Sequence, residues 1–175
     1  LAHAINAEGP RNLAVAAKTH GARLIQISTD YVFDGSASEP YQENAATHPI
    51  SAYGRTKEAG ERAVLEEYPE GSIIVRTSWL YGEQGSSFPK SILAAAQDND
   101  FLRVVSDQIG QPTWTVDVAV MIRSLINKGI ASGIYHATNE GQTTWFGFAT
   151  KLFELAGWDP ARLVPVEINH GISVY

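Results

Sequence analysis

The chain has no cysteine among its 175 residues. It therefore has no disulfide framework, no thiolate nucleophile and no cysteine-ligated zinc site. Asn-x-Ser/Thr glycosylation sequons are absent as well. These absences are typical of a protein in a reducing environment, and we expect a cytoplasmic location.

Long apolar segments are also missing from the sequence. No run approaches the ~20 apolar residues that a bilayer span requires. Residues 1–20 lack a basic stretch followed by an apolar block and a small-residue cleavage site, so we expect neither a signal peptide nor a membrane partner. With 44% of its residues hydrophobic and 18% charged, the chain has the composition of one compact domain.

Positive charge is scarce, since 13 Lys and Arg residues stand against 19 Asp and Glu residues, for a net charge of −6. The attraction that dominates non-specific nucleic-acid binding therefore has the wrong sign, and we expect no nucleic-acid partner. The five histidines do not show the close spacing of zinc ligands, and we expect no metal site. No Gly-x-Ser-x-Gly elbow indicates a hydrolase.

What the sequence does contain is an alternation of strand-like and helix-like segments. Predicted strands lie at 23–28, 72–76, 102–105 and 133–137, and predicted helices at 1–20, 49–68, 87–97, 116–128 and 144–156, with Gly9-Pro10 interrupting the first helix and a long loop at 34–49. Such alternation is typical of an α/β fold with a doubly wound parallel sheet, which is Rossmann-like. The tail from Leu163 is predicted to be mixed strand and turn.

The sequence has neither an initial strand nor the glycine-rich loop of a dinucleotide-binding fold. The first residues are already helical, and no Gly-x-Gly-x-x-Gly motif stands at a strand-to-helix junction. Either the fold needs no dinucleotide, or the chain begins partway through a larger domain.

Tyr53 and Lys57 are the first candidate catalytic pair. A spacing of four on a predicted helix puts both side chains on one face, with a rise of ~6 Å between them. A nearby ammonium favours the phenolate, so we expect Lys57 to lower the pKa of Tyr53 and prepare it to protonate a carbonyl oxygen. The alternative is structural: Tyr53 packs at a helix edge while Lys57 pairs with Glu61.

Thr29 and Asp30 follow the predicted strand at 23–28. Side chains at the carboxyl end of a parallel strand face the crevice where open α/β sheets bind ligands. A threonine hydroxyl there can hold the substrate oxygen that Tyr53 protonates. The alternative is that these residues only form the turn after the strand.

Five ordered strings in the sequence carry a family resemblance: STDYVFDG at 28–35, PY-x-E at 40–43, YGRTKEAGE at 53–61, RTSWLYG at 76–82 and DQ-x-G-x-PT at 107–113. A hydroxyl residue at a strand end followed by Tyr-x-x-x-Lys resembles the extended short-chain dehydrogenases/reductases. Together the strings resemble the dTDP-4-dehydrorhamnose reductase family, over residues 1 to about 157.

The resemblance implies a function and a set of site residues. The intact protein would reduce the 4-keto group of dTDP-4-dehydro-L-rhamnose by hydride transfer from NADPH or NADH. Thr29, Tyr53 and Lys57 would be catalytic, with Tyr53 and Lys57 also binding the cofactor, while Thr29, Asp30 and Trp79 would bind the nucleotide sugar. An indole suits a sugar or base face, although a Trp after an apolar strand is about as often part of the core.

The resemblance also implies an N-terminally incomplete domain. Residues 1–80 would be the remaining part of the nucleotide-binding domain, and residues 81–175 would complete it and form a smaller substrate-binding lobe. Members of the family begin with a strand and a glycine-rich loop, which by this resemblance would precede Leu1. Homodimerisation is left open.

Two other functions compete with this interpretation. One is a nucleotide-sugar dehydratase or epimerase, although dehydratases carry Thr-Asp-Glu where this chain has Thr29, Asp30 and Tyr31. The other is a non-catalytic regulatory subunit that still binds a dinucleotide. Turnover of the keto sugar by the intact protein distinguishes them.

We predict that the 175-residue chain by itself binds NADPH weakly or not at all. The backbone amides and helix N-terminus that hold a pyrophosphate come from the glycine-rich segment, which this sequence does not include. Calorimetric titration measures this affinity directly. Micromolar binding would contradict the prediction.

Overall fold

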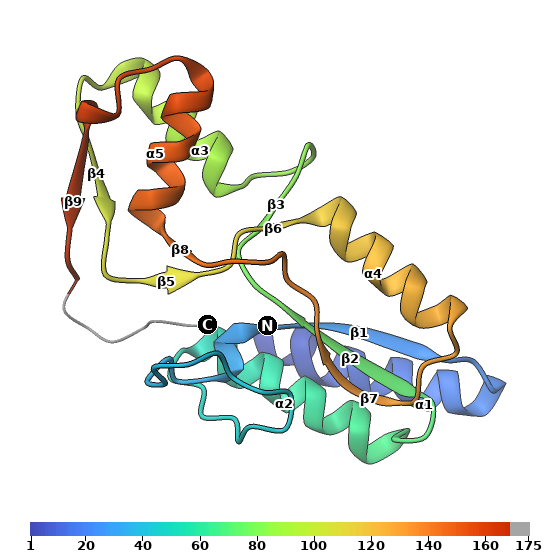
Figure 1. The fold of residues 1–175 in the computed structure, drawn as a ribbon. Coiled ribbons are helices and arrows are strands. Elements are labelled where there is room, and N and C mark those ends of the chain that lie inside the picture. Colours follow the sequence, from blue (N-terminus) through green and yellow to red (C-terminus); the bar gives the residue numbers. More distant parts are fainter. Residues whose placement is uncertain (169–175) are drawn as a thin grey trace.

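The computed structural model describes residues 1–168, and its centre is a three-stranded parallel sheet (Figure 1). The sheet has the order β1-β2-β7, with β1 at Leu24–Thr29, β2 at Ser72–Thr77 and β7 at Gly133–His136. Strand β2 is central and every one of its residues is buried. The strands predicted at 23–28, 72–76 and 133–137 are therefore confirmed, and they share one sheet.

Helices cover both faces of this sheet. Helix α1 (Gly9–His20) follows a π-helical turn at Ala4–Glu8 and packs with α2 (Ala52–Glu67) on one face. Helix α4 (Thr115–Asn127) lies on the other face (Figure 1). The disturbance predicted at Gly9-Pro10 is seen as a change of helix type and not as a break: residues 2–20 are helical throughout, and the π-helical turn ends at Glu8, directly before Pro10 in the first turn of α1.

The two-residue period of a strand explains this layering. Ile74 packs into a cluster with Ala14 of α1 and Val64 of α2. Its neighbours Ile73 and Val75 point to the opposite face, where the α4 side chains Met121, Ile122 and Leu125 cover them. The doubly wound α/β fold predicted from the sequence is confirmed.

A smaller lobe lies beside the sheet (Figure 1). It contains α3 (Phe88–Asp98), β4 (Leu102–Val105), α5 (Trp145–Ala156) and β9 (Leu163–Val166). Its core is a separate cluster around the fully buried Phe153, with Ile92, Val104 and Leu163. The remaining elements are short: β3 (Leu80–Tyr81) pairs with β6 (Thr113–Trp114), β5 (Ile109–Gly110) pairs with β8 (Thr143–Thr144), and 3-10 turns lie at Asp30–Val32 and Pro160–Arg162.

The strand predicted at 102–105 exists, but it lies outside the main sheet. It pairs in parallel with β9, whose residues were predicted only as mixed strand and turn. Burial of Val104 against the lobe core decides this placement, which hydrophobic periodicity does not reveal. Residues 169–175 of the predicted tail lie outside the described residues.

A buried ion pair joins α2 to the middle of the sheet. Arg76 of β2 donates from Nε and Nη2 to the Glu61 carboxylate, at 2.9 Å to Oε1 and 2.6 Å to Oε2. The same guanidinium donates to the Glu43 carbonyl at 3.3 Å, and the Glu43 side chain accepts a hydrogen bond from the His136 backbone N–H. Helix, sheet and the loop at 33–51 are thus connected through Arg76.

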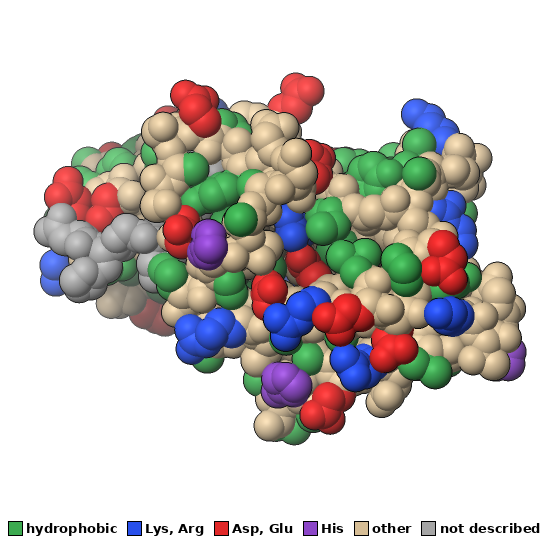
Figure 2. All heavy atoms as spheres, turned by 90° about the horizontal axis from the view of Figure 1, so that it is seen from below, with side chains coloured by type: hydrophobic (Ala, Val, Ile, Leu, Met, Phe, Trp, Pro, Cys, Tyr) green, Lys and Arg blue, Asp and Glu red, His purple; other side chains and the backbone are tan. Residues whose placement is uncertain are grey.

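The outer face of α1 and α2 carries charges of both signs, interspersed as Figure 2 shows. Arg11 pairs with Glu66 and Glu67, and Arg62 pairs with Glu66, all at 3.5–3.8 Å between exposed side chains.

In residues 1–168 no helix combines the length and hydropathy that crossing a membrane would take.

We predict that Glu61→Ala lowers the free energy of unfolding of the chain by about 3–5 kcal/mol, because it leaves the Arg76 guanidinium buried without its partner. Glu66→Ala removes exposed ion pairs from the same helix and should cost about 0–1 kcal/mol. Urea denaturation of both variants measures the difference. Equal losses would show that the buried pair has no special role in stability.

Candidate active site

One hollow at the carboxyl ends of β1 and β2 brings together all five residues predicted from the sequence. Its volume is about 330 Å³. Strand β1 and the turn after it supply Thr29 and Asp30, helix α2 supplies Tyr53 and Lys57, and Trp79 follows β2. We call this hollow the catalytic cavity, after the role predicted for Thr29, Tyr53 and Lys57; its other lining residues are Ile27, Ser28, Tyr31, Thr77, Ser78, Leu80 and Trp145.

Tyr53 is brought to the cavity by the start of α2. The Ser51 hydroxyl caps this helix by accepting from the Gly54 N–H at 2.9 Å. Gly54 lies so close to the Tyr31 carbonyl that a Cβ atom there would be 2.1 Å from its oxygen. Glycine at position 54 thus lets α2 approach the turn after β1, and the Tyr53 ring meets the Tyr31 ring edge-on at 5.9 Å.

Lys57 lies one helical turn further along α2 and is partly buried. Its Nζ donates to the Ile27 carbonyl of β1 at 2.7 Å, which leaves two N–H donors for a ligand. Burial lowers the pKa of Lys57, and the negative charge of Glu61 opposes this shift. The alternative in which Lys57 only pairs with Glu61 is wrong, because Glu61 binds Arg76.

The prediction that Lys57 lowers the pKa of Tyr53 is also wrong for this arrangement. Burial raises the pKa of Tyr53 above 10.0, with a hydrogen bond to Thr29 acting against the rise and the Asp30 charge adding to it. The ammonium of Lys57 is directed to the Ile27 carbonyl instead. Tyr53 therefore carries its proton at neutral pH, as a proton donor must.

The Thr29 hydroxyl combines the two roles that the sequence left open. It donates to Asp30 Oδ1 at 2.9 Å and accepts from the Tyr31 N–H at 3.3 Å, so it caps the 3-10 turn at Asp30–Val32. It also lines the catalytic cavity. Its single hydrogen is engaged and one acceptor site remains.

Asp30 is buried, with only 6% of its surface exposed. Burial raises its pKa to about 7, although the hydrogen bonds from Thr29 and from backbone N–H groups act in the opposite direction. Its second oxygen, Oδ2, has no hydrogen-bond partner within residues 1–168. The structure places the predicted substrate-binding residue at the cavity wall, where little of it is accessible.

Trp79 lies between the sheet and the lobe. Its indole stacks on that of Trp145 at 3.5 Å and 10°, and Gly110 lies so close to the ring that a Cβ there would be 2.3 Å away. Trp79 is also a non-glycine residue with positive φ, at 44°. Such strain persists only where surrounding contacts enforce it, and it is concentrated at functional sites.

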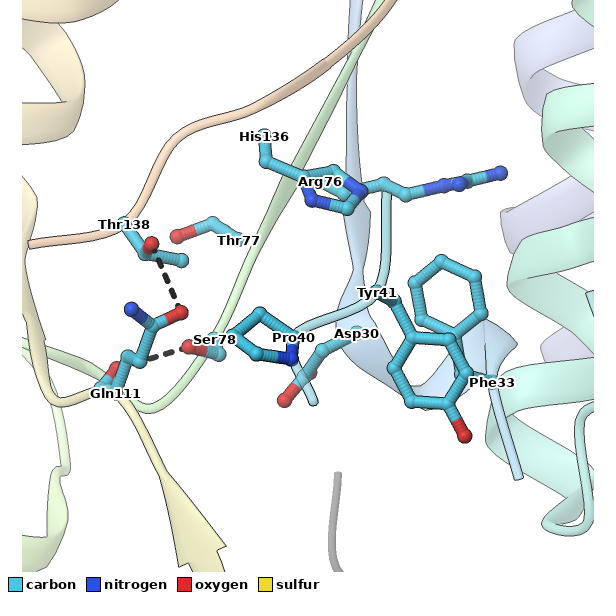
Figure 3. A pocket seen from close by; sticks show the side chains of 10 residues that line it. All are labelled: Asp30, Phe33, Pro40, Tyr41, Arg76, Thr77, Ser78, Gln111, His136 and Thr138. Atoms are coloured by element: carbon cyan, nitrogen blue, oxygen red, sulfur yellow. Dashed lines mark hydrogen bonds between the residues drawn. The ribbon is translucent and has the colours of Figure 1, made fainter. Parts of the chain in front are cut away.

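A second cavity of about 50 Å³ adjoins the first (Figure 3). The two share Asp30, Thr77 and Ser78. Sequence reasoning missed this cavity, although eight of its ten lining residues lie in the quoted strings, among them Tyr41 in PY-x-E and Gln111 in DQ-x-G-x-PT. Gln111 is held there by Ser78 Oγ, which donates to its carbonyl at 2.8 Å, and by Thr138 Oγ1, which donates to its side chain at 3.1 Å.

Sequence reasoning also missed Trp145 and the Glu61–Arg76 pair. Glu61 lies in the string YGRTKEAGE and Arg76 in RTSWLYG. The signal that could have revealed the pair is Arg76, a charged residue within the apolar predicted strand at 72–76. Nothing in the local sequence links Trp145 to Trp79. Within residues 1–168 no group of three or more acidic or histidine side chains is placed to hold a metal ion.

The chain matches the RmlD substrate binding domain family over residues 1–171. A dTDP-4-dehydrorhamnose reductase from Streptomyces griseus is 52% identical over 169 residues, which cover 94% of this chain and 56% of the relative. A dTDP-4-keto-6-deoxy-D-glucose reductase from Streptomyces niveus is 49% identical over 162 residues, covering 93% and 56%. The chain thus spans little more than half the length of these relatives.

Solved structures agree with this assignment. The dTDP-4-dehydrorhamnose reductase from Bacillus anthracis, in complex with NADP, superposes with a TM-score of 0.89 at 44% identity, over 94% of this chain and 58% of that one. A dTDP-glucose 4,6-dehydratase from the same organism has a TM-score of 0.83 at 19% identity, which shows a shared fold alone. The sequence match over nearly the whole chain, together with the shared fold, shows that the chain belongs to the RmlD substrate binding domain family.

Proposed function

We propose that the whole protein reduces the 4-keto group of dTDP-4-dehydro-L-rhamnose to dTDP-L-rhamnose, using NADPH or NADH. The observation that carries this proposal is the convergence of Thr29, Tyr53 and Lys57 on one cavity at the carboxyl ends of parallel strands. A bound nicotinamide cofactor would supply the hydride.

The cofactor proposal fits the residues that this chain contributes. Lys57 has two N–H donors beyond its bond to Ile27, and its position on α2 beside Tyr53 suits the hydroxyls of a nicotinamide ribose. Tyr53 keeps its proton until a carbonyl oxygen that receives the hydride becomes basic enough to accept it. Trp79 and Trp145 offer indole surface to the sugar nucleotide.

The structure disfavours elimination chemistry at this site. Where dehydratases have a carboxylate, this chain has Tyr31, and burial together with the Asp30 charge raises the pKa of that phenol. A phenol with a raised pKa is a poor base at neutral pH. A reductase is therefore better supported than a dehydratase.

We propose that the two parts of the chain have different roles in the domains of the whole protein. Residues 1–80 would form the remaining part of the nucleotide-binding domain, and residues 81–175 would complete it and build the substrate lobe. Strand β7 and helix α4 lie within residues 81–175 and pack in the main sheet layer, which supports the proposal that this part completes the nucleotide-binding domain. The separate core around Phe153 supports the proposal that it also forms a substrate lobe. A cytoplasmic location and a homodimer also stay predictions, which cell fractionation and size-exclusion chromatography test.

In the whole protein, we predict that Tyr53→Phe lowers kcat by the ~10²–10⁴-fold typical of a lost acid–base group. Cofactor affinity should change little, because the ring is retained. Tyr68→Phe makes the same change at the end of α2, outside the catalytic cavity, and should leave kcat unaltered. Steady-state reduction of the keto sugar is the assay; near-normal turnover by the Tyr53 variant would assign this residue to packing, and a wild-type protein without turnover would favour a regulatory subunit.

For Trp79→Ala we predict a rise in KM for the sugar nucleotide of about 5- to 150-fold, which corresponds to ~1–3 kcal/mol of lost stacking. Trp158→Ala removes an indole from the lobe core, where Trp158 contacts Phe153, and should lower Tm without raising KM. Both quantities are measured on each variant. If Trp79→Ala loses Tm but keeps its KM, Trp79 is a core residue and not a substrate platform.

A further inference from the structure

The second cavity has an unusual polar lining. Three buried polar atoms that lack a hydrogen-bond partner within residues 1–168 belong to its wall: Asp30 Oδ2, Thr77 Oγ1 and His136 Nε2. Unpaired buried polar atoms are costly, and in proteins they are usually satisfied by ordered water. A cavity of about 50 Å³ is large enough for at least one water molecule.

This cavity also leads toward solvent. Pro40 and Gln111 of its wall are shared with a surface groove that includes the exposed residues Glu39 and Gly141. Figure 3 shows Asp30 on the side of the cavity opposite His136, with Pro40 between them in the view. Water in this cavity would therefore connect the buried Asp30 carboxyl to the outside of the molecule.

The Thr29 hydroxyl is placed between Asp30 and Tyr53: it donates to Asp30 Oδ1, and its interaction with the Tyr53 phenol acts to lower the pKa of that phenol. While Asp30 is ionised, the Thr29 hydroxyl gives its only hydrogen to Asp30 Oδ1 and can do no more than accept at Tyr53. Protonation of Asp30 reverses the direction of these hydrogen bonds. Asp30 then donates to the Thr29 hydroxyl, and the Thr29 hydrogen is free to point at the Tyr53 oxygen. The order of atoms is that of a proton relay.

We propose that Asp30 stores the proton that is returned to Tyr53 after each reduction, that Thr29 passes it on, and that water in the second cavity reloads Asp30. The proposal rests on the proposed reductase function. In each cycle the carbonyl carbon receives a hydride and its oxygen takes the Tyr53 proton. The phenolate then takes the Thr29 hydrogen while Thr29 takes the Asp30 proton, and the resulting Asp30 carboxylate is protonated from solvent through the cavity water.

The charged and titratable groups around Asp30 suit this task. They lie on every neighbouring element: Tyr31 on the same turn, Tyr41 on the loop, Tyr53 and Lys57 on α2, Arg76 on β2 and His136 on β7. Arg76, a cationic residue that lines the second cavity, forms its ion pair with Glu61 and not with Asp30. Lys57 donates to a backbone carbonyl, and burial lowers the pKa of His136. Burial therefore dominates and raises the pKa of Asp30 to about 7, so at neutral pH Asp30 both holds and releases a proton.

The test compares single and multiple turnovers of Asp30→Asn in the whole protein. The asparagine side chain keeps an acceptor for the Thr29 hydroxyl and a polar group in the cavity, but it has no proton to pass on. In wild type and variant alike, Tyr53 enters the first cycle with its own proton, so the single-turnover rate of hydride transfer should stay within about threefold. Steady-state kcat should fall by about tenfold or more, with KM nearly unchanged.

The pH profile gives a second readout. Wild-type kcat should decline as the pH rises through about 7, because Asp30 then loses the proton that the relay needs, and this decline should be absent from Asp30→Asn. Asp98→Asn is the matched control, since Asp98 is exposed at the end of α3 and lines neither cavity. It should retain both kcat and the wild-type profile.

Three outcomes would overturn the relay. They are an unchanged kcat and pH profile for Asp30→Asn, a raised KM with unchanged kcat, which would make Asp30 a substrate-binding residue only, and a fall in the single-turnover rate equal to that in kcat. A wild-type protein without turnover would instead overturn the proposed function. A crystal structure of the chain that shows no water within hydrogen-bond reach of Asp30 Oδ2 would overturn the role of the cavity.

Discussion

The buried ion pair between Glu61 and Arg76 is the interaction on which the geometry of the site depends. Glu61 is two helical turns beyond Tyr53 and one beyond Lys57, so all three project from the same face of α2. Arg76 lies on the central strand, one residue before the end of β2. By joining these two groups at 2.6 Å, the pair holds the reactive face of the helix against the carboxyl ends of β1 and β2. A buried pair of this kind contributes positional specificity more reliably than net stability.

The same buried surroundings determine the chemistry of the site. Removal from water raises the pKa values of Tyr53 and Asp30 and lowers that of Lys57, so each group is displaced toward its neutral form. A phenol that keeps its proton and a carboxyl with a pKa of about 7 are suited to moving protons rather than to strong charge stabilisation. Under the proposed reductase function, the cofactor would supply the hydride, and this part of the protein would supply the proton and orient the substrate.

The lobe contributes at the border between the two cores. Trp79 follows the end of β2 and has a positive φ angle. Its indole stacks on Trp145 at the start of α5, so the sheet and the lobe are in contact through one aromatic pair. Gln111, on the loop after β5, closes the second cavity from the lobe side through its bonds with Ser78 and Thr138. Residues from the loop, the sheet and the lobe thus enclose Asp30, whose burial no single segment produces.

The sequence by itself determined the features that depend on local spacing. Hydrophobic periodicity and capping residues act over a few positions, so the helices, the strands of the main sheet and the shared face of Tyr53 and Lys57 were predictable. Only the tertiary structure decided which sheet the strand at 102–105 joins, that Arg76 takes Glu61 away from Lys57, and that Trp145 lies under Trp79. It also decided the direction of the Tyr53 pKa and the burial of Asp30. The reason is that desolvation and side-chain partners come from residues far apart in the chain, and no local pattern records which of them will meet.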